Sequence, residues 1–171
     1  MSEPGYFIRQ ATVEDVVWYG SNKVVAGTAT YEKAPEMVKA TPELLRKNLF
    51  ETPYAHTLLA VTGTPSAPGK AIGMAMYFYN YSTWTGRPGL YLEDLFVDEA
   101  FRGKGIGKAF FAELGKIAKE KNCARMDWSV LDWNQPSRDF YEKKLGAKPM
   151  TSWIGMRLEE EGIDKLASLA S

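Results

Sequence analysis

A glycine-rich loop with three basic residues carries the first chemical signal in this 171-residue sequence. Glycines let backbone N–H groups approach a ligand closely, and the start of a helix adds unpaired donors and a positive dipole end. The loop therefore predicts a cradle for a phosphate or pyrophosphate, with a glycine-rich turn and solvated lysines as the alternative. Its spacing matches neither the dinucleotide G-x-G-x-x-G nor a Walker loop. Its residues are Arg102, Gly103, Lys104, Gly105, Ile106, Gly107 and Lys108.

Two adjacent acids, Glu93 and Asp94, interrupt the apolar run over 90–97, just upstream of that loop. A carboxylate in such a place is a candidate for accepting a proton, and a strand carboxylate in a salt bridge is the alternative. Successive side chains of a strand point to opposite faces. Both acids therefore face one site only if a β-bulge breaks the alternation, which makes Asp94 the weaker candidate.

The composition excludes several other classes of chemistry. With 21 Lys+Arg against 21 Asp+Glu, the formal net charge is zero, which argues against a basic nucleic-acid surface and a polybasic membrane anchor. One Cys and one His cannot form a disulfide or a Cys/His zinc site, so we expect no metal, an inert Cys123 and no catalytic role for His56. Since no apolar run approaches membrane-spanning length, we expect a soluble, cytoplasmic protein.

Hydrophobic periodicity predicts a single domain over residues 1–171 with an α+β fold. The clearest helix spans 106–121, and Thr12 and Thr41 are predicted N-caps of two earlier helices. We expect a mostly antiparallel sheet flanked by helices, with one parallel crossover from the strand over 90–97 to the strand over 124–130. The remaining predicted elements are strands over 6–9, 57–61, 71–79 and 151–158, helices over 136–144 and 162–169, and breaker-rich turns over 62–69 and 81–89.

The segment 91–107 resembles the acetyl-CoA motif of the GNAT superfamily of N-acetyltransferases, in which Arg/Gln-x-x-Gly-x-Gly joins a strand to a helix. A second segment, 131–147, resembles the region of that superfamily where an Asn and a Tyr follow a splayed strand and contact the cofactor. Two separated motifs at compatible spacing argue against a chance match. The resemblance implies the GNAT fold, with acetyl-CoA as co-substrate bound between splayed parallel strands.

Most of the chain is similar to the spermidine/spermine acetyltransferase family. Segments 81–84 and 130–134 are more similar to its thialysine acetyltransferase branch. The polyamine branch carries an acidic patch near a late Glu-Gly-Trp, whereas residues 153–156 here are Trp-Ile-Gly-Met. This departure argues against recognition of long polyamines. The resemblance thus implies a thialysine-like amino acid or a short diamine as the acceptor.

The resemblance also implies a β-bulge on the strand that carries Glu93 and Asp94, and it implies the residues of the site, with Glu93 as base and Tyr141 as acid. The residues expected at the cofactor are Leu95, Phe96, Val97, the loop over 102–108, Asn134, Pro136, Ser137 and Tyr141. Those expected at the amine are Tyr31, Glu32, Ser82, Thr83, Trp84, Glu93, Asp94, Asp127, Trp128, Ser129, Leu131 and Asp132.

These residues suit acetyl transfer from a thioester to an amine. A lysine-like amine has a pKa near 10.4, so only about one molecule in 2,500 is the free nucleophile at pH 7, and Glu93 would accept its proton directly or through a water. Tyr141 would protonate the leaving sulfur. Because a free Tyr has a pKa near 10 and a thiol about 8.5, full transfer is uphill by roughly 2 kcal/mol unless the Tyr pKa is lowered or proton transfer and C–S cleavage are concerted. A helix Tyr that only covers the core is the alternative.

Three other functions stay open at this point: spermidine/spermine acetylation, protein or peptide N-acetylation, and a non-catalytic acyl-CoA-binding module. The resemblance implies a homodimer, and we expect no nucleic-acid or membrane partner. The zero net charge is compatible with two opposite patches. The cations of the glycine loop would meet an anionic cofactor, and Glu32, Glu93, Asp94 and Asp132 would meet a cationic amine.

Overall fold

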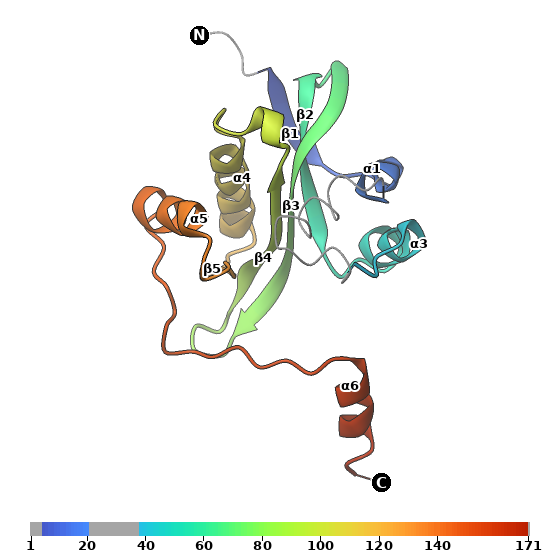
Figure 1. Cartoon of the computed structure of the whole chain (residues 1–171), viewed down its shortest axis with the longest axis vertical. Coiled ribbons are helices and arrows are strands. Elements are labelled where there is room, and N and C mark those ends of the chain that lie inside the picture. The colour runs from blue at the N-terminus through green and yellow to red at the C-terminus, as the bar shows by residue number, and fades with distance from the viewer. Residues whose placement is uncertain (1–4, 21–37, 171) are drawn as a thin grey trace. The chain divides into compact units, whose positions relative to one another are not determined.

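The computed structural model describes residues 5–20 and 38–170 (Figure 1). Tyr31 and Glu32, which the sequence places at the amine, lie outside these described residues. The chain forms two compact units, which divide between Ser129 and Val130. Within the described ranges, no helix is long and apolar enough to cross a membrane.

The first unit is built on a five-stranded sheet in the order β1-β2-β3-β4-β5 (Figure 1). Strands β1 to β4 are antiparallel to their neighbours, whereas β4 and β5 pair in parallel. This arrangement confirms the predicted mixed, mostly antiparallel sheet. The strands are β1 (Tyr6–Gln10), β2 (His56–Thr64), β3 (Ala67–Ser82), β4 (Arg87–Val97) and β5 (Arg125–Trp128).

Helix α4 (Ile106–Glu120) covers one face of this sheet, as its apolar period predicts. Ile106, Phe110 and Leu114 are at most 2% exposed and pack with Leu90 and Leu92 of β4. Burial of this stripe fixes the N-terminus of α4. The loop over 102–108, which follows the short 3-10 helix η4 (Glu99–Phe101), is thereby held near the end of β4.

Two short helices cover the opposite face of the sheet (Figure 1). They are α1 (Val16–Gly20), which follows the 3-10 turn η1 (Val13–Asp15), and α3 (Pro42–Arg46), which continues into the π-helical turn η3 (Lys47–Glu51). Both predicted N-caps are confirmed. The Thr41 hydroxyl accepts from the Leu44 N–H at 3.3 Å, and Thr12 precedes η1.

The hairpin turns are shorter than the breaker residues predict. Strands β2 and β3 are paired out to Thr64 and Ala67, and β3 and β4 out to Ser82 and Arg87. The predicted turns over 62–69 and 81–89 are therefore too wide. The reason is local: the Thr62 hydroxyl accepts from the Lys70 N–H at 3.0 Å, so the ladder continues past the prolines.

The second unit contains α5 (Gln135–Asp139), the π-helical turn η5 (Phe140–Lys144) and α6 (Glu160–Ala167). These elements confirm the two helices predicted after residue 130. The strand predicted over 151–158 is wrong, because in the described chain these residues pair with no strand. Their apolar side chains are exposed, Met156 at 91%, so alternation alone does not stabilise a strand without a partner.

Candidate active site

A β-bulge in β4 is the feature on which the site is built. Met76 of β3 lies opposite Asp94, and the next residue, Tyr77, lies opposite Leu92. Glu93 is therefore an extra residue with no partner position on β3. A bulge of this kind bends the strand and redirects the side chains beside it.

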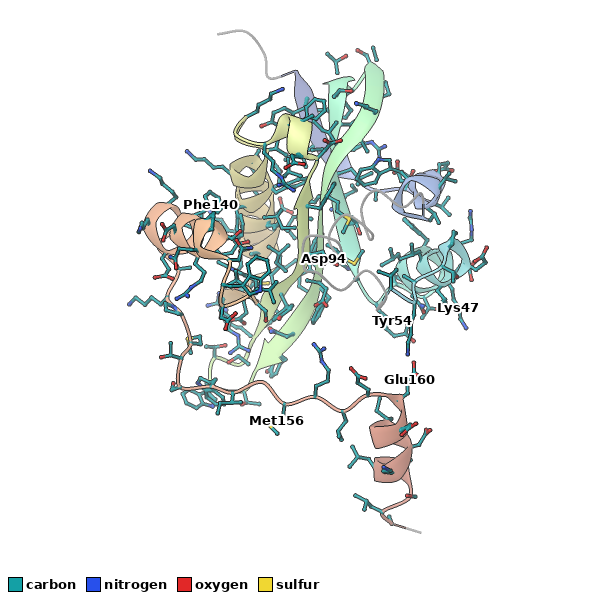
Figure 2. All side chains as sticks on the ribbon, in the orientation of Figure 1. Lys47, Tyr54, Asp94, Phe140, Met156 and Glu160 are labelled. Atoms are coloured by element: carbon teal, nitrogen blue, oxygen red, sulfur yellow. The ribbon has the colours of Figure 1, made fainter. Side chains whose placement is uncertain are left out.

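The bulge places both acids on one face of the sheet. Leu92 before it and Leu95 after it contact the same core, beneath α4. Because neighbouring side chains alternate, Glu93 must point away from the Leu92 side and Asp94 away from the Leu95 side. Both carboxylates thus lie on the face opposite α4, and Asp94 is labelled in Figure 2. Glu93 and Asp94 can therefore face one site, because the β-bulge that this requires is present.

Aromatic and polar side chains from three strands share that face with the acids. The Phe78 and Tyr91 rings lie 5.1 Å apart between centroids, in register with Asp127 of β5. The Tyr91 hydroxyl lies 2.8 Å from the Ser129 hydroxyl. The face therefore offers an aromatic floor next to a carboxylate pair, which suits a cationic ligand with an apolar stem.

Strand β5 ends at Trp128, level with the start of the bulge in β4. Their parallel pairing extends from Gly89 to Leu92 on β4, whereas β4 itself continues to Val97. The Asp98 N–H donates to the Ile72 carbonyl of β3 at 2.9 Å. Because the N–H groups of a strand alternate between its two edges, those of Leu95 and Val97 point to the edge on which β5 pairs only as far as Leu92. The Phe96 N–H, by the same alternation, points to β3.

The glycine loop has the backbone that an anion cradle needs. Gly103 and Gly105 have φ values of +76° and +82°, and a Cβ at either position would meet nothing within 4 Å. Gly105 is the N-cap of α4, so no N-cap side chain satisfies the N–H groups of the first turn. Space and backbone donors therefore coincide at the positive end of the helix dipole.

Cations gather around this loop as the sequence predicts. The Arg102 Nε donates to the Val97 carbonyl at 3.1 Å, and Lys108 is exposed on the first turn of α4. The Lys104 Nζ lies 4.8 Å from the centroid of the Phe101 ring. Lys70 of β3, which sequence reasoning missed, places its Nζ 5.2 Å from the same ring.

The second unit presents its predicted residues on α5 and η5. Asn134 is 8% exposed and N-caps α5, because its Oδ1 accepts from the Ser137 N–H at 3.3 Å. Tyr141 is partly buried on η5, with its ring 5.6 Å from that of Phe140. Leu131, Asp132 and Pro136 are exposed. The Asn134 amide thus has a local structural role in addition to any contact with a ligand.

Some predicted amine-site residues are not brought to the acidic face. The Trp128 ring packs edge-on against Phe111 of α4 at 5.1 Å, which places Trp128 on the α4 side of the sheet. Trp84, in the turn between β3 and β4, is 89% exposed, so within residues 5–20 and 38–170 it forms no wall of a covered pocket. Thr83 is also exposed in that turn, whereas Ser82 at the end of β3 is buried.

Arg125 is the residue of this face that the sequence reasoning missed, whereas Asp127 was a predicted site residue and the bulge was expected from the family resemblance. Both the bulge and the face of Arg125 have a signal in the sequence. The apolar residues Leu90 and Leu92 are out of phase with Leu95 and Val97, and that phase change marks the bulge. In β5, charged residues alternate with Met126 and Trp128, which places Arg125 and Asp127 on the face of the acids.

Comparison with known proteins decides the family. The profile of the Acetyltransferase (GNAT) family matches residues 27–147. The chain belongs to this family. It is an N-acetyltransferase with the GNAT fold, as the sequence resemblance implies.

Curated relatives in the family are similar over most of the chain. A thialysine N-epsilon-acetyltransferase from Bos taurus is 38% identical over 85% of this chain and 88% of its own length. A spermidine/spermine N(1)-acetyltransferase-like protein from Homo sapiens is 35% identical over 75% of this chain and 18% of its own length. Among solved structures, an integron cassette protein from V. cholerae aligns with a TM-score of 0.73 at 26% identity, over 96% of this chain and 98% of that one.

The glycine loop allows a matched test of its backbone. Gly105→Ala should lower the free energy of unfolding by about 1–2 kcal/mol, because Ala is strained at a φ of +82°. Gly107→Ala adds a methyl group to the same loop at a position without a positive φ. The free energy of unfolding of this variant should be unchanged or raised by up to about 1 kcal/mol. Urea unfolding of both variants checks this, and equal losses would show that the left-handed backbone at Gly105 is not needed.

Proposed function

We propose that this N-acetyltransferase transfers the acetyl group of acetyl-CoA to a primary amine of a small cationic molecule. The preferred acceptors are thialysine-like amino acids and short diamines. One observation carries the proposal: the β4 bulge puts Glu93 and Asp94 on one face, beside the edge where the Leu95 and Val97 amides point outward. The names of the relatives support the choice of acceptor.

The residues present fit acetyl-CoA, which supplies the acetyl group as an activated thioester when bound. The first turn of α4, with Gly103, Gly105 and the loop cations, would hold the pyrophosphate. The outward N–H groups of Leu95 and Val97 would hold the pantetheine arm and the thioester oxygen. Asn134, Pro136 and Ser137 would contribute from α5.

Glu93 would act as the general base. An amine with a pKa near 10.4 is almost fully protonated at pH 7, so a proton must leave before nitrogen can attack. Glu93 is exposed at the bulge, where it can accept that proton directly or through a water. Asp94 on the same face, together with Glu32 and Asp132, would hold the cationic acceptor close to the thioester.

Tyr141 would act as the general acid. As the amine nitrogen bonds to the acetyl carbon, the C–S bond breaks and the sulfur needs a proton. Tyr141 would donate its phenolic proton to that sulfur. The ammonium loses two protons on becoming an amide: Glu93 takes the one that leaves before attack, and the one that leaves as the amide forms replaces the proton that Tyr141 gives to sulfur. The products are the N-acetyl amine, the free thiol and one proton on Glu93.

Other acceptors define the alternatives. Spermidine or spermine is the first, which the human relative's name supports, and protein or peptide amines are the second. A non-catalytic acyl-CoA-binding module is the alternative outside enzymes. We further propose that the enzyme acts as a cytoplasmic homodimer, by resemblance to its family.

Amine-dependent thiol release tests the proposal as a whole. Purified protein with acetyl-CoA should release thiol only when an amine is added, with thialysine, lysine and short diamines turned over faster than spermine. Mass spectrometry should find the acetyl group on the amine. Saturable CoA binding without amine-dependent thiol would instead indicate a binding module.

The base assignment predicts a loss of turnover without a loss of cofactor affinity. Glu93→Gln should lower kcat by about 100- to 10,000-fold, because the substrate proton loses its acceptor. The dissociation constant of CoA, measured by calorimetry, should stay within about twofold of wild type. Glu113→Gln, which neutralises an acid on α4 across the sheet, is the control and should keep wild-type turnover. Full activity of Glu93→Gln would remove Glu93 from the mechanism.

The acid assignment makes a parallel prediction. Tyr141→Phe should slow acetyl transfer by about 100-fold or more, because the leaving sulfur then lacks its proton donor. Tyr54→Phe removes the hydroxyl of a tyrosine that is 72% exposed and should leave kcat unchanged. Steady-state kinetics with the best amine measures both. Equal rates for Tyr141→Phe and wild type would assign Tyr141 to packing.

A further inference from the structure

The face that carries Glu93 and Asp94 also carries a cation that the proposed reaction does not use. Arg125 begins β5, and its register partner on β4 is Gly89. Arg125 lies on the face opposite α4, because its neighbour Met126 packs into the core beneath α4. A positive side chain does not help to bind a cationic amine, so the presence of Arg125 on this face needs another explanation.

The missing side chain of Gly89 lets Arg125 fold across the sheet. A Cβ at Gly89 would lie 3.1 Å from Arg125 Cγ and 3.3 Å from Arg125 Nε. The Arg125 side chain therefore runs over β4 instead of leaving the edge strand toward solvent. This path holds the guanidinium over the acidic face. Because the Arg125 side chain is still 45% exposed, a ligand can reach the guanidinium.

Asp127 and Asn80 fix the orientation of this guanidinium. The Arg125 Nε lies 2.8 Å from Asp127 Oδ2, and the Asn80 Nδ2 lies 3.5 Å from the same oxygen. The ion pair with Asp127 is made by the Nε atom of Arg125. The two Nη groups are then donors in the planar fork that matches a carboxylate.

The spacing between Arg125 and the bulge matches an amino acid of lysine length. Gly89, beside Arg125, and Glu93 are four residues apart on β4, but the bulge shortens this to about three and a half strand residues, or about 12 Å. The six bonds from the terminal nitrogen to the carboxylate carbon of lysine span roughly 7–8 Å when extended. A hydrogen bond of about 3 Å at each end brings that span to about 13–14 Å. Between the two ends lies the Tyr91 ring, over which an aliphatic stem can pack.

We propose that Arg125 binds the α-carboxylate of the acceptor, so that the enzyme selects diamino acids of lysine length over diamines of equal length. The inference rests on the proposed function, and it assigns a specificity role to a residue outside the reacting groups. Asp127, beside Arg125, accepts from the α-ammonium of the same head group. A diamine offers Arg125 only a second positive charge, which the guanidinium repels.

Matched amines with and without the carboxylate test this inference. Lysine and cadaverine share one carbon chain, and thialysine and its decarboxylated analogue form a second pair. Wild type should show a higher kcat/KM for the amino acid of each pair. Arg125→Met should lower that preference about 10- to 100-fold, the effect of one charge-assisted contact. Most of the change should appear in KM for the amino acid, with cadaverine turnover kept or raised.

Two further variants complete the design. Arg125→Lys keeps the charge without the fork and should retain part of the preference. Lys116→Met removes the cation of another exposed ion pair, with Glu113 on α4, and should leave the preference unchanged. Turnover of cadaverine by each variant shows that it is folded.

The outcomes separate this inference from the proposed function. An unchanged preference in Arg125→Met, or a wild type that favours the diamines, would overturn the role of Arg125 while acetyl transfer to amines stands. Absence of transfer to every amine would overturn the proposed function and this inference with it.

Discussion

The antiparallel ladder between β3 and β4 has one residue too many on the β4 side, and the site depends on that mismatch. Burial decides where the extra residue goes. Without the bulge, either the buried Leu92 or the partly buried Leu95 would leave the core under α4; full burial of a leucine side chain contributes about 1.5–3 kcal/mol, and partial burial contributes less. A carboxylate would also enter that core at a higher cost. The apolar residues on both sides therefore drive Glu93 and Asp94 onto the opposite face.

The same strand links the two charged regions of the first unit. At its end, the buried stripe of α4 holds the glycine loop and its cations in place. At the bulge, two acids and outward-pointing amides lie beside the point where β5 and its pairing with β4 end. Zero net charge thus conceals a positive region suited to an anionic cofactor and an acidic face suited to an amine. Arg125 adds a positive charge within the acidic face, and we propose that this charge favours acceptors that carry a carboxylate as well as an amine.

Sequence patterns predicted correctly those elements whose formation depends on neighbouring residues in the chain. The apolar period of α4 and the Thr41-Pro42 start of α3 needed no tertiary information, and both are confirmed. The strand over 151–158 failed because a strand needs a partner, which its alternating residues do not specify. The bulge was expected from family resemblance alone, although the shift in phase between Leu92 and Leu95 encodes it. Arg125 was missed because its position depends on Gly89, a register partner 36 residues earlier in the sequence.

A crystal structure with a covalent CoA–amine adduct, in which the acetyl bridge joins sulfur to the acceptor nitrogen, tests the central claim most directly. The account predicts the acceptor nitrogen on the face opposite α4, within hydrogen-bond reach of Glu93 directly or through one water. It also predicts that the carbonyl oxygen of the acetyl bridge accepts a hydrogen bond from the outward N–H of Leu95 or Val97. An acceptor nitrogen on the α4 side of the sheet, or remote from the bulge, would contradict it.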